Sequence, residues 1–84
     1  MEFDAVILDL MLPDISGRDI LVRIRKNEAT RGLPVLVLSV KSLESDVLEI
    51  FSLGAGDYIK KPFNPRELVK RLKILIQKAS EKKP

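Results

Sequence analysis

The sequence predicts an α/β fold built on a small parallel sheet, and three observations indicate it. Residues 6–8 (VIL) and 35–38 (VLVL) are short, continuous apolar runs, which are typical of strands buried on both faces. Each run is followed by a segment whose apolar residues recur at helical spacing. The elements therefore alternate as strand and helix three times, with connections so short that the strands should be parallel.

The first strand and the helix after it are marked by clear boundary residues. The apolar run of the strand ends on Asp9, and Pro13 and Gly17 then indicate a loop. Ser16 can cap a helix, with Asp19 three residues later, close to a capping box. This helix should extend to about Asn27 and be followed by the second strand, which ends on Ser39.

A second helix and a third, shorter strand are predicted in the middle of the chain. Ser42 can cap a helix over residues 43–53, and Gly54 follows where a left-handed residue commonly ends a helix. Residues 57–60 (DYIK) then predict the third strand. The apolar positions of the helix are Leu43, Val47, Ile50 and Phe51.

Three signals agree on the start of the last helix. Asn64 is a favourable cap, Pro65 suits the first helical position, and Glu67 suits the third. We expect one domain over residues 1–79 and a C-terminal tail or linker stub over 80–84. The helix carries one apolar stripe: Leu68, Leu72, Leu75, Ile76 and Ala79.

Composition excludes several classes of function. The chain of 84 residues has no cysteine, histidine or tryptophan, which excludes disulfides, thiolate metal sites and imidazole catalysis. It has no long apolar run and no signal-peptide pattern, so we expect a cytoplasmic protein without a membrane segment. Residues 1–59 carry a net charge of −4 and residues 60–84 a net charge of +7. Because the basic part has one aromatic residue and no nucleic-acid motif, a solvated helix face is favoured over direct nucleic-acid binding.

The topology should gather three polar side chains at one end of the sheet. Right-handed crossovers place the first two helices on one face, and the last helix can return to the other. The carboxyl ends of all three strands then point the same way, and this is where open α/β sheets bind ligands. Asp9, Ser39 and Lys61 lie at or just past these ends. A carboxylate, a hydroxyl and an ammonium group around one point can bind or transfer an anionic group.

Three stretches of the sequence resemble one family. These are DLMLPDISG from Asp9, the strand that ends at Ser39, and GAGDYIKKPFNPREL from Gly54. Together they closely resemble the receiver domain of bacterial two-component response regulators, over essentially all of residues 3–78. The spacings from Asp9, 30 residues to Ser39 and 52 to Lys61, also fit this family. The resemblance implies a flavodoxin-like fold.

The resemblance also implies roles for individual residues. Asp9 would accept a phosphoryl group from a histidine kinase or phosphotransfer protein, in a regulatory protein rather than an enzyme. Ser39 would hydrogen-bond the phosphoryl group, and Lys61 would pair with it. Tyr58 would be the aromatic switch residue, although an ordinary half-packed strand tyrosine is the alternative.

Further implications concern the peptide backbone and a metal ion. Pro62 would follow a cis peptide bond, and Met11 would offer its backbone carbonyl to Mg²⁺, which Asp9 also binds. Val40 stands where the family prefers a small residue, which could restrict access to the site.

The sequence also lacks part of the family pattern. The family domain begins with a β-α-β-α part that supplies an acidic pair for Mg²⁺, and this chain would be a truncated domain without it. Glu2, Asp4 and Asp57 should lie at the wrong end of the strands, and Asp14 is on the loop. The metal site is therefore expected to be incomplete, because Mg²⁺ requires octahedral oxygen coordination.

Two functions from different classes remain open at this point. One is a truncated phosphorelay receiver, and the alternative is a non-phosphorylated protein–protein interaction or dimerisation module. A nucleotide-binding enzyme is disfavoured because no glycine-rich phosphate loop is present. Truncation should expose the strand at Ala5–Leu8 as an edge and open an apolar patch beside Val6 and Leu8. We therefore expect a homodimer or larger assembly through this strand.

Overall fold

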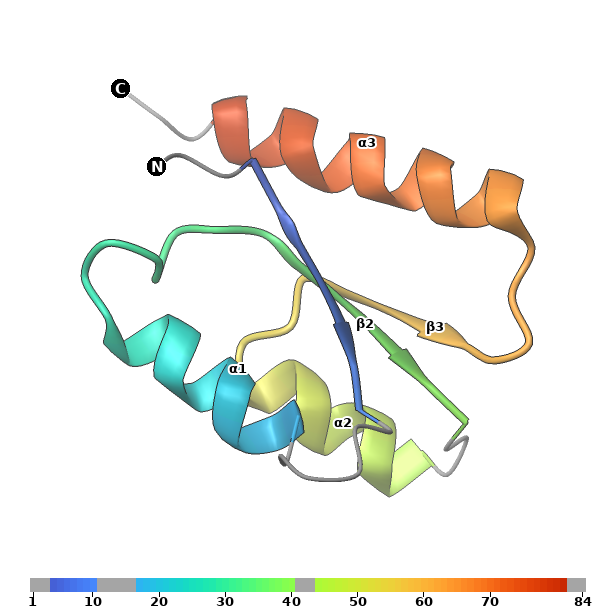
Figure 1. The fold of residues 1–84 in the computed structure, drawn as a ribbon, viewed down its shortest axis with the longest axis horizontal. Coiled ribbons are helices and arrows are strands. Elements are labelled where there is room, and N and C mark those ends of the chain that lie inside the picture. Colours follow the sequence, from blue (N-terminus) through green and yellow to red (C-terminus); the bar gives the residue numbers. More distant parts are fainter. Residues whose placement is uncertain (1–3, 11–16, 41–43, 82–84) are drawn as a thin grey trace.

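The computed structural model describes residues 4–10, 17–40 and 44–81 of the chain. Strands and helices alternate strictly along these residues (Figure 1). This order matches the sequence-based prediction. The elements are β1 (Val6–Asp9), α1 (Gly17–Lys26), β2 (Val35–Ser39), α2 (Glu44–Ser52), β3 (Asp57–Lys60) and α3 (Pro65–Glu81).

The three strands form one parallel sheet in the order β1-β2-β3. In its register, Val6 lies beside Val35 and Asp9 beside Leu38. On the other side of β2, Ser39 lies beside Lys60. The carboxyl ends of the strands therefore lie at one end of the sheet, and the predicted α/β class is confirmed.

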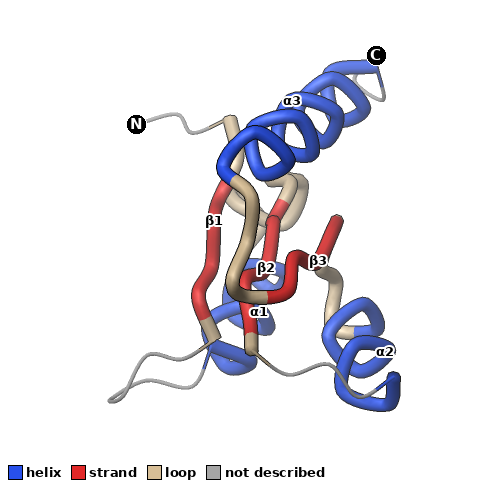
Figure 2. The backbone as a smooth tube through the Cα atoms, turned by 90° about the vertical axis from the view of Figure 1, so that its right-hand side faces the viewer, coloured by secondary structure: helices blue, strands red, loops and turns tan. Residues whose placement is uncertain are grey.

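The helices cover both faces of the sheet, as predicted. Helices α1 and α2 lie on one face and α3 on the other, with the strands between them (Figure 2). All five residues of β2 are buried, which explains the continuous apolar run that predicted this strand.

Each face of the sheet has its own apolar core. The core beneath α1 and α2 consists of Leu8, Leu21, Val35, Val37, Ile50 and Ala55. The core beneath α3 consists of Leu36, Leu38 and Ile59, against which Phe63, Leu68, Leu72 and Leu75 pack. Alternate residues of β2 thus enter opposite cores, as side chains of a strand must. Phe51, which we expected on the apolar stripe of α2, is instead 41% exposed, one helical step around from buried Ile50.

Two predicted helix boundaries have the geometry that the sequence indicates. Gly54 has a φ of 110°, a left-handed conformation that ends α2. At the start of α3, the side-chain oxygen of Asn64 accepts a hydrogen bond of 2.8 Å from the backbone N–H of Arg66. The predicted cap Ser42 lies outside the described residues.

Helix α3 extends past residue 79, after which we expected a C-terminal tail. The helix continues to Glu81, so Ser80 and Glu81 belong to it rather than to a tail. Residues 66–83 contain no glycine or proline, so nothing in the local sequence stops the helix at residue 79.

The predicted position of the exposed apolar patch was also wrong. Leu8 is buried beneath α1 and Val6 is partly buried against the same core, whereas Ile7 is 46% exposed. The reason is the two-residue period of a strand, because neighbouring side chains point to opposite faces. Ile7 lies on the α3 face, and the described part of the chain does not cover it there.

At the amino end of the sheet, the guanidinium group of Arg25 links two segments that are far apart in the sequence. Its Nε and Nη2 donate to the carbonyl oxygen of Gly54 at 2.9 and 2.7 Å. Its Nη1 donates to the carbonyl oxygens of Leu33 at 2.6 Å and Arg31 at 3.1 Å. One side chain of α1 thus fixes the segment before β2 and the turn after α2. Burial lowers the pKa of Arg25 from its usual value.

Among the described helices, none is both long enough and apolar enough to cross a membrane.

Candidate functional site

The structure brings Asp9 and Lys61 together, although 52 residues separate them in the sequence. The ammonium Nζ of Lys61 forms an ion pair with Oδ2 of Asp9. The backbone N–H of Lys61 also donates to the carbonyl oxygen of Ser39 at 2.8 Å. The ends of β1, β2 and β3 are therefore connected at one point, as the parallel topology predicts.

Burial differs between the members of this site. Ser39 is fully buried at the end of β2. The side chains of Asp9 and Lys61 are 36% and 28% exposed, so a reagent in solution can reach the carboxylate. Val40, predicted to restrict access, is itself 48% exposed. The arrangement offers a reachable carboxylate nucleophile beside a fixed positive charge, which suits reaction with an anionic group.

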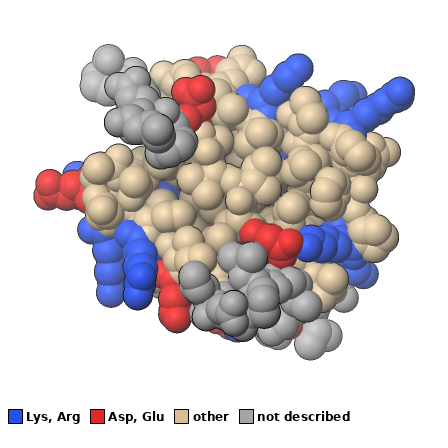
Figure 3. Space-filling view, in the orientation of Figure 1, with Lys and Arg blue, Asp and Glu red and all other residues tan. Residues whose placement is uncertain are grey.

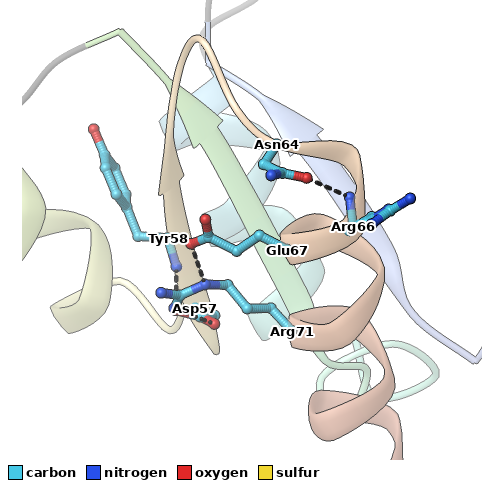
Figure 4. A network of polar contacts seen from close by, with 6 residues as sticks. All are labelled: Asp57, Tyr58, Asn64, Arg66, Glu67 and Arg71. Carbon is cyan, nitrogen blue, oxygen red and sulfur yellow. Dashed lines mark hydrogen bonds and ion pairs between the residues drawn. The ribbon is translucent and has the colours of Figure 1, made fainter.

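The chain around this site follows the expected geometry. The peptide bond between Lys61 and Pro62 is cis. Tyr58 lies beside Val37 in the register and packs against the core beneath α1 and α2. In Figure 4 the ring of Tyr58 extends away from α3. Met11 lies outside the described residues.

A second polar cluster, which the sequence analysis did not predict, lies at the start of β3 (Figure 4). Nη1 of Arg71 contacts the two carboxylate oxygens of Asp57 at 3.1 and 3.2 Å, and its Nε donates to Glu67 at 2.9 Å. The hydrogen bonds that Arg71 donates to Asp57 and Glu67 raise the pKa of Arg71 from its usual value. The four-residue spacing of Glu67 and Arg71 was a readable signal for the helical pair. Asp57 was not predictable, because it joins from another element.

The described residues do not form a magnesium site by themselves. Among residues 4–10, 17–40 and 44–81, no group of three or more acidic, histidine or cysteine side chains is placed to hold a metal ion. Asp57 lies at the amino end of β3, beside Leu36 in the register, and pairs with Arg71. Asp9, at the carboxyl end of β1, can contribute one of the six oxygen ligands that Mg²⁺ requires.

Comparison with known proteins identifies the family. A model of the response regulator receiver domain matches residues 1–73. The chain belongs to this family. The matched residues include Asp9, the buried Ser39 and Lys61.

Individual response regulators are similar to the chain over most of its length. The phosphate regulon transcriptional regulatory protein PhoB of Pseudomonas aeruginosa is 41% identical over 75 residues, which are 89% of this chain and 33% of that protein. The transcriptional regulatory protein ResD of Bacillus subtilis is 40% identical over 79 residues, 94% of this chain and 32% of that protein. The receiver chain thus spans about one third of the curated relatives that it matches.

Solved receiver domains have the same fold. The response regulator DrrB of Thermotoga maritima has a TM-score of 0.81 at 38% identity, over 93% of this chain and 35% of that chain. The receiver domain of the sensor histidine kinase PA1611 of Pseudomonas aeruginosa, solved with a magnesium ion in its active-site cleft, has a TM-score of 0.79 at 31% identity. This comparison covers 92% of the present chain and 63% of the solved PA1611 receiver-domain chain.

Proposed function

We propose that this receiver chain carries the phosphoacceptor part of a two-component signalling protein, with Asp9 as the acceptor. The observation that supports this most directly is the ion pair between Asp9 and Lys61 at the carboxyl end of the sheet. Family membership supports it independently, because receiver domains of response regulators interact with histidine kinases or phosphotransfer proteins. The phosphodonor in the cell would be one of these proteins.

The proposed chemistry requires one bond to form and one to break. A carboxylate oxygen of Asp9 attacks the phosphorus atom, and the bond from phosphorus to the donor's leaving atom breaks, with its electron pair remaining on the donor. The product is an acyl phosphate on Asp9. The ammonium group of Lys61 then pairs with the new phosphoryl oxygens, and the hydroxyl of Ser39 hydrogen-bonds one of them. Tyr58 would turn inward as the switch residue.

We further propose that the isolated chain accepts phosphate slowly. Receiver domains use Mg²⁺, and the acidic pair that holds it would come from a preceding part of the domain. Asp4 and Asp57 lie at the amino ends of β1 and β3, away from Asp9. Without a fully held cation, the transferring group loses charge neutralisation worth several kcal/mol.

Incubation with acetyl phosphate and Mg²⁺, followed by intact-mass measurement, tests both statements. We expect partial and slow addition of one phosphoryl group to the chain and no addition to Asp9→Asn. Rapid stoichiometric phosphorylation would contradict the proposed weakness of the metal site. Phosphorylation of Asp9→Asn at the rate of the parent chain would contradict the assignment of the acceptor.

A second candidate function is a protein–protein interaction module that works without phosphate. Exposed apolar side chains on α2 favour it: Leu48 is 59% exposed and Phe51 is 41% exposed. In this case Asp9→Asn would retain partner binding. We propose that in either case the protein is cytoplasmic, is not an enzyme, does not contact nucleic acid directly, and self-associates through the strand Ala5–Leu8.

A further inference from the structure

The start of helix α1 closely approaches the end of strand β1. Gly17, the first residue of α1, is buried, and so is Leu21 one turn later. A Cβ atom placed on Gly17 would overlap Cδ2 of Leu10 and would lie 3.0 Å from its Cα. Ordinary contacts between carbon atoms are about 3.5–4.0 Å long. Because Leu10 directly follows Asp9, this close approach lies beside the candidate functional site.

Glycine is needed at residue 17 for its lack of a side chain rather than for its backbone conformation. The φ of Gly17 lies outside the left-handed region, unlike that of Gly54. Alanine can therefore adopt the backbone conformation of residue 17, and it forms helices better than glycine. The steric cost of a side chain would fall on Leu10. The side chain of Leu10 packs against the core beneath α1 and α2, which limits its movement, and its Cα belongs to the main chain.

A shift of Leu10 would be transmitted to Asp9. The two residues share a peptide group, and a peptide group is planar and rigid. The backbone N–H of Leu10 donates to the carbonyl oxygen of Leu38 at 3.1 Å, and Asp9 lies beside Leu38 in the register. Displacement of Leu10 would therefore change the backbone from which the carboxylate of Asp9 extends.

The ammonium partner of this carboxylate is positioned by other elements. The backbone N–H of Lys61 donates to the carbonyl oxygen of Ser39 at 2.8 Å, and Ser39 is fully buried. This hydrogen bond joins the ends of β2 and β3 and does not involve Leu10. Figure 3, in the orientation of Figure 1, shows acidic and basic side chains meeting at the surface near the arrowhead ends of the strands. A shift of Leu10 would therefore move the carboxylate relative to an ammonium group that stays in place.

We propose that Gly17 is a positioning residue, which fixes the carboxylate of Asp9 relative to Lys61 by leaving room for Leu10. This inference rests on the proposed role of Asp9 as phosphoacceptor and adds a residue that does not touch the reacting atoms. Phosphoryl transfer depends on the placement of the attacking oxygen, and a misplacement of about 1 Å can lower a rate about 100-fold. A shift of about a few tenths of an ångström should therefore lower the rate several-fold.

Amide NMR signals of the 84-residue chain test this placement without any phosphodonor. In Gly17→Ala the amide of Leu10 should exchange its hydrogen faster than in the parent chain, because its bond to β2 would weaken. The amide signals of Asp9 and Lys61 should also shift. Gly32→Ala is the matched control, because no atom lies within 4 Å of its added Cβ. The control should leave all three amides as they are in the parent chain.

Intact-mass measurement after incubation with acetyl phosphate and Mg²⁺ tests the effect on chemistry. We expect Gly17→Ala to accept phosphate about threefold to tenfold more slowly than the parent chain. Gly32→Ala should accept phosphate at the rate of the parent chain. Urea unfolding should show that both variants remain folded.

The same substitution in a Leu10→Ala background tests the route of the effect. Leu10→Ala removes the Cδ2 atom that the added Cβ would overlap, so Gly17→Ala should lower the rate by a smaller factor there. The Cα atom of residue 10 remains 3.0 Å from the added Cβ. The amide signals of Asp9 and Lys61 should therefore still shift, and this comparison applies even if Gly17→Ala alone does not fold.

Three results would overturn the inference. The first is that the amide signals of Asp9 and Lys61 in Gly17→Ala match those of the parent chain. The second is phosphorylation of Gly17→Ala at the parent rate, and the third is an equal reduction of the rate with and without the Leu10 side chain. Shifted signals in a chain that accepts no phosphate at all would support the positioning role and contradict the proposed acceptor function instead.

Discussion

The two ends of the sheet are built in different ways. At the amino end, Arg25 donates four hydrogen bonds to three backbone carbonyls, and Arg71 pairs with the carboxylate of Asp57. At the carboxyl end, Asp9 and Lys61 form an ion pair whose side chains are about one third exposed. Arg25 at the amino end therefore holds backbone carbonyls, whereas the Asp9–Lys61 pair at the carboxyl end joins two side chains.

This difference separates stability from chemistry. A guanidinium group that donates hydrogen bonds to main-chain carbonyls stabilises the fold. When the guanidinium group is removed, each of these carbonyls loses a hydrogen-bond partner. An exposed ion pair contributes little to folding and is available for reaction. We therefore expect substitutions at the amino end to change stability and substitutions at the carboxyl end to change phosphoryl transfer.

The largest effect on stability is expected for Arg25→Met. Methionine keeps most of the apolar stem but removes every donor to Gly54, Leu33 and Arg31, at a cost of about 2–3 kcal/mol. Urea unfolding at a fixed protein concentration measures this loss. Arg23→Met, an exposed position on the same helix, is the control and should unfold within about 0.5 kcal/mol of the parent chain. Equal stability of the two variants would show that the Arg25 contacts are not important for folding.

A smaller loss is expected for Gly54→Ala, which disturbs the same end of the sheet from the other side of the contact. The φ of 110° is unfavourable for alanine, and the added Cβ would lie 2.7 Å from Nε of Arg25. We expect destabilisation of about 1–2 kcal/mol by the same urea measurement. Gly32→Ala is the control, because no atom lies within 4 Å of its added Cβ. It should be neutral or slightly stabilising, and an equal loss at both glycines would contradict the role of the Arg25 contact.

The sequence predicted the carboxyl end of the sheet better than the amino end. Asp9 and Ser39 each follow a recognisable apolar run and Lys61 follows the third predicted strand, so strand topology alone brings them together. The contacts of Arg25 could not be predicted, because its acceptors are backbone carbonyls and a carbonyl is present at every residue. The exposed patch of β1 was predicted beside Val6 and Leu8, but the exposed side chain is Ile7. Successive side chains of a strand point to opposite faces, so an error of one residue exchanges the buried and the exposed positions.

Of the three substitutions, Lys61→Met should change stability least, but it should strongly reduce phosphoryl transfer to Asp9. The Lys61–Asp9 pair is partly exposed, so its loss should change the free energy of unfolding by about 0–1 kcal/mol. The ammonium group is, however, the described positive charge that pairs with Asp9, and the transferring phosphoryl group is anionic. We expect intact-mass measurement after incubation with acetyl phosphate to show much less phosphorylated Lys61→Met than parent chain. Arg71→Met removes a charge of the same sign from the amino end and should be phosphorylated as the parent chain is. Two results would contradict the separate roles of the two ends. One is a free energy of unfolding for Lys61→Met that falls well below that of the parent chain, and the other is phosphorylation of Lys61→Met to the same extent as the parent chain.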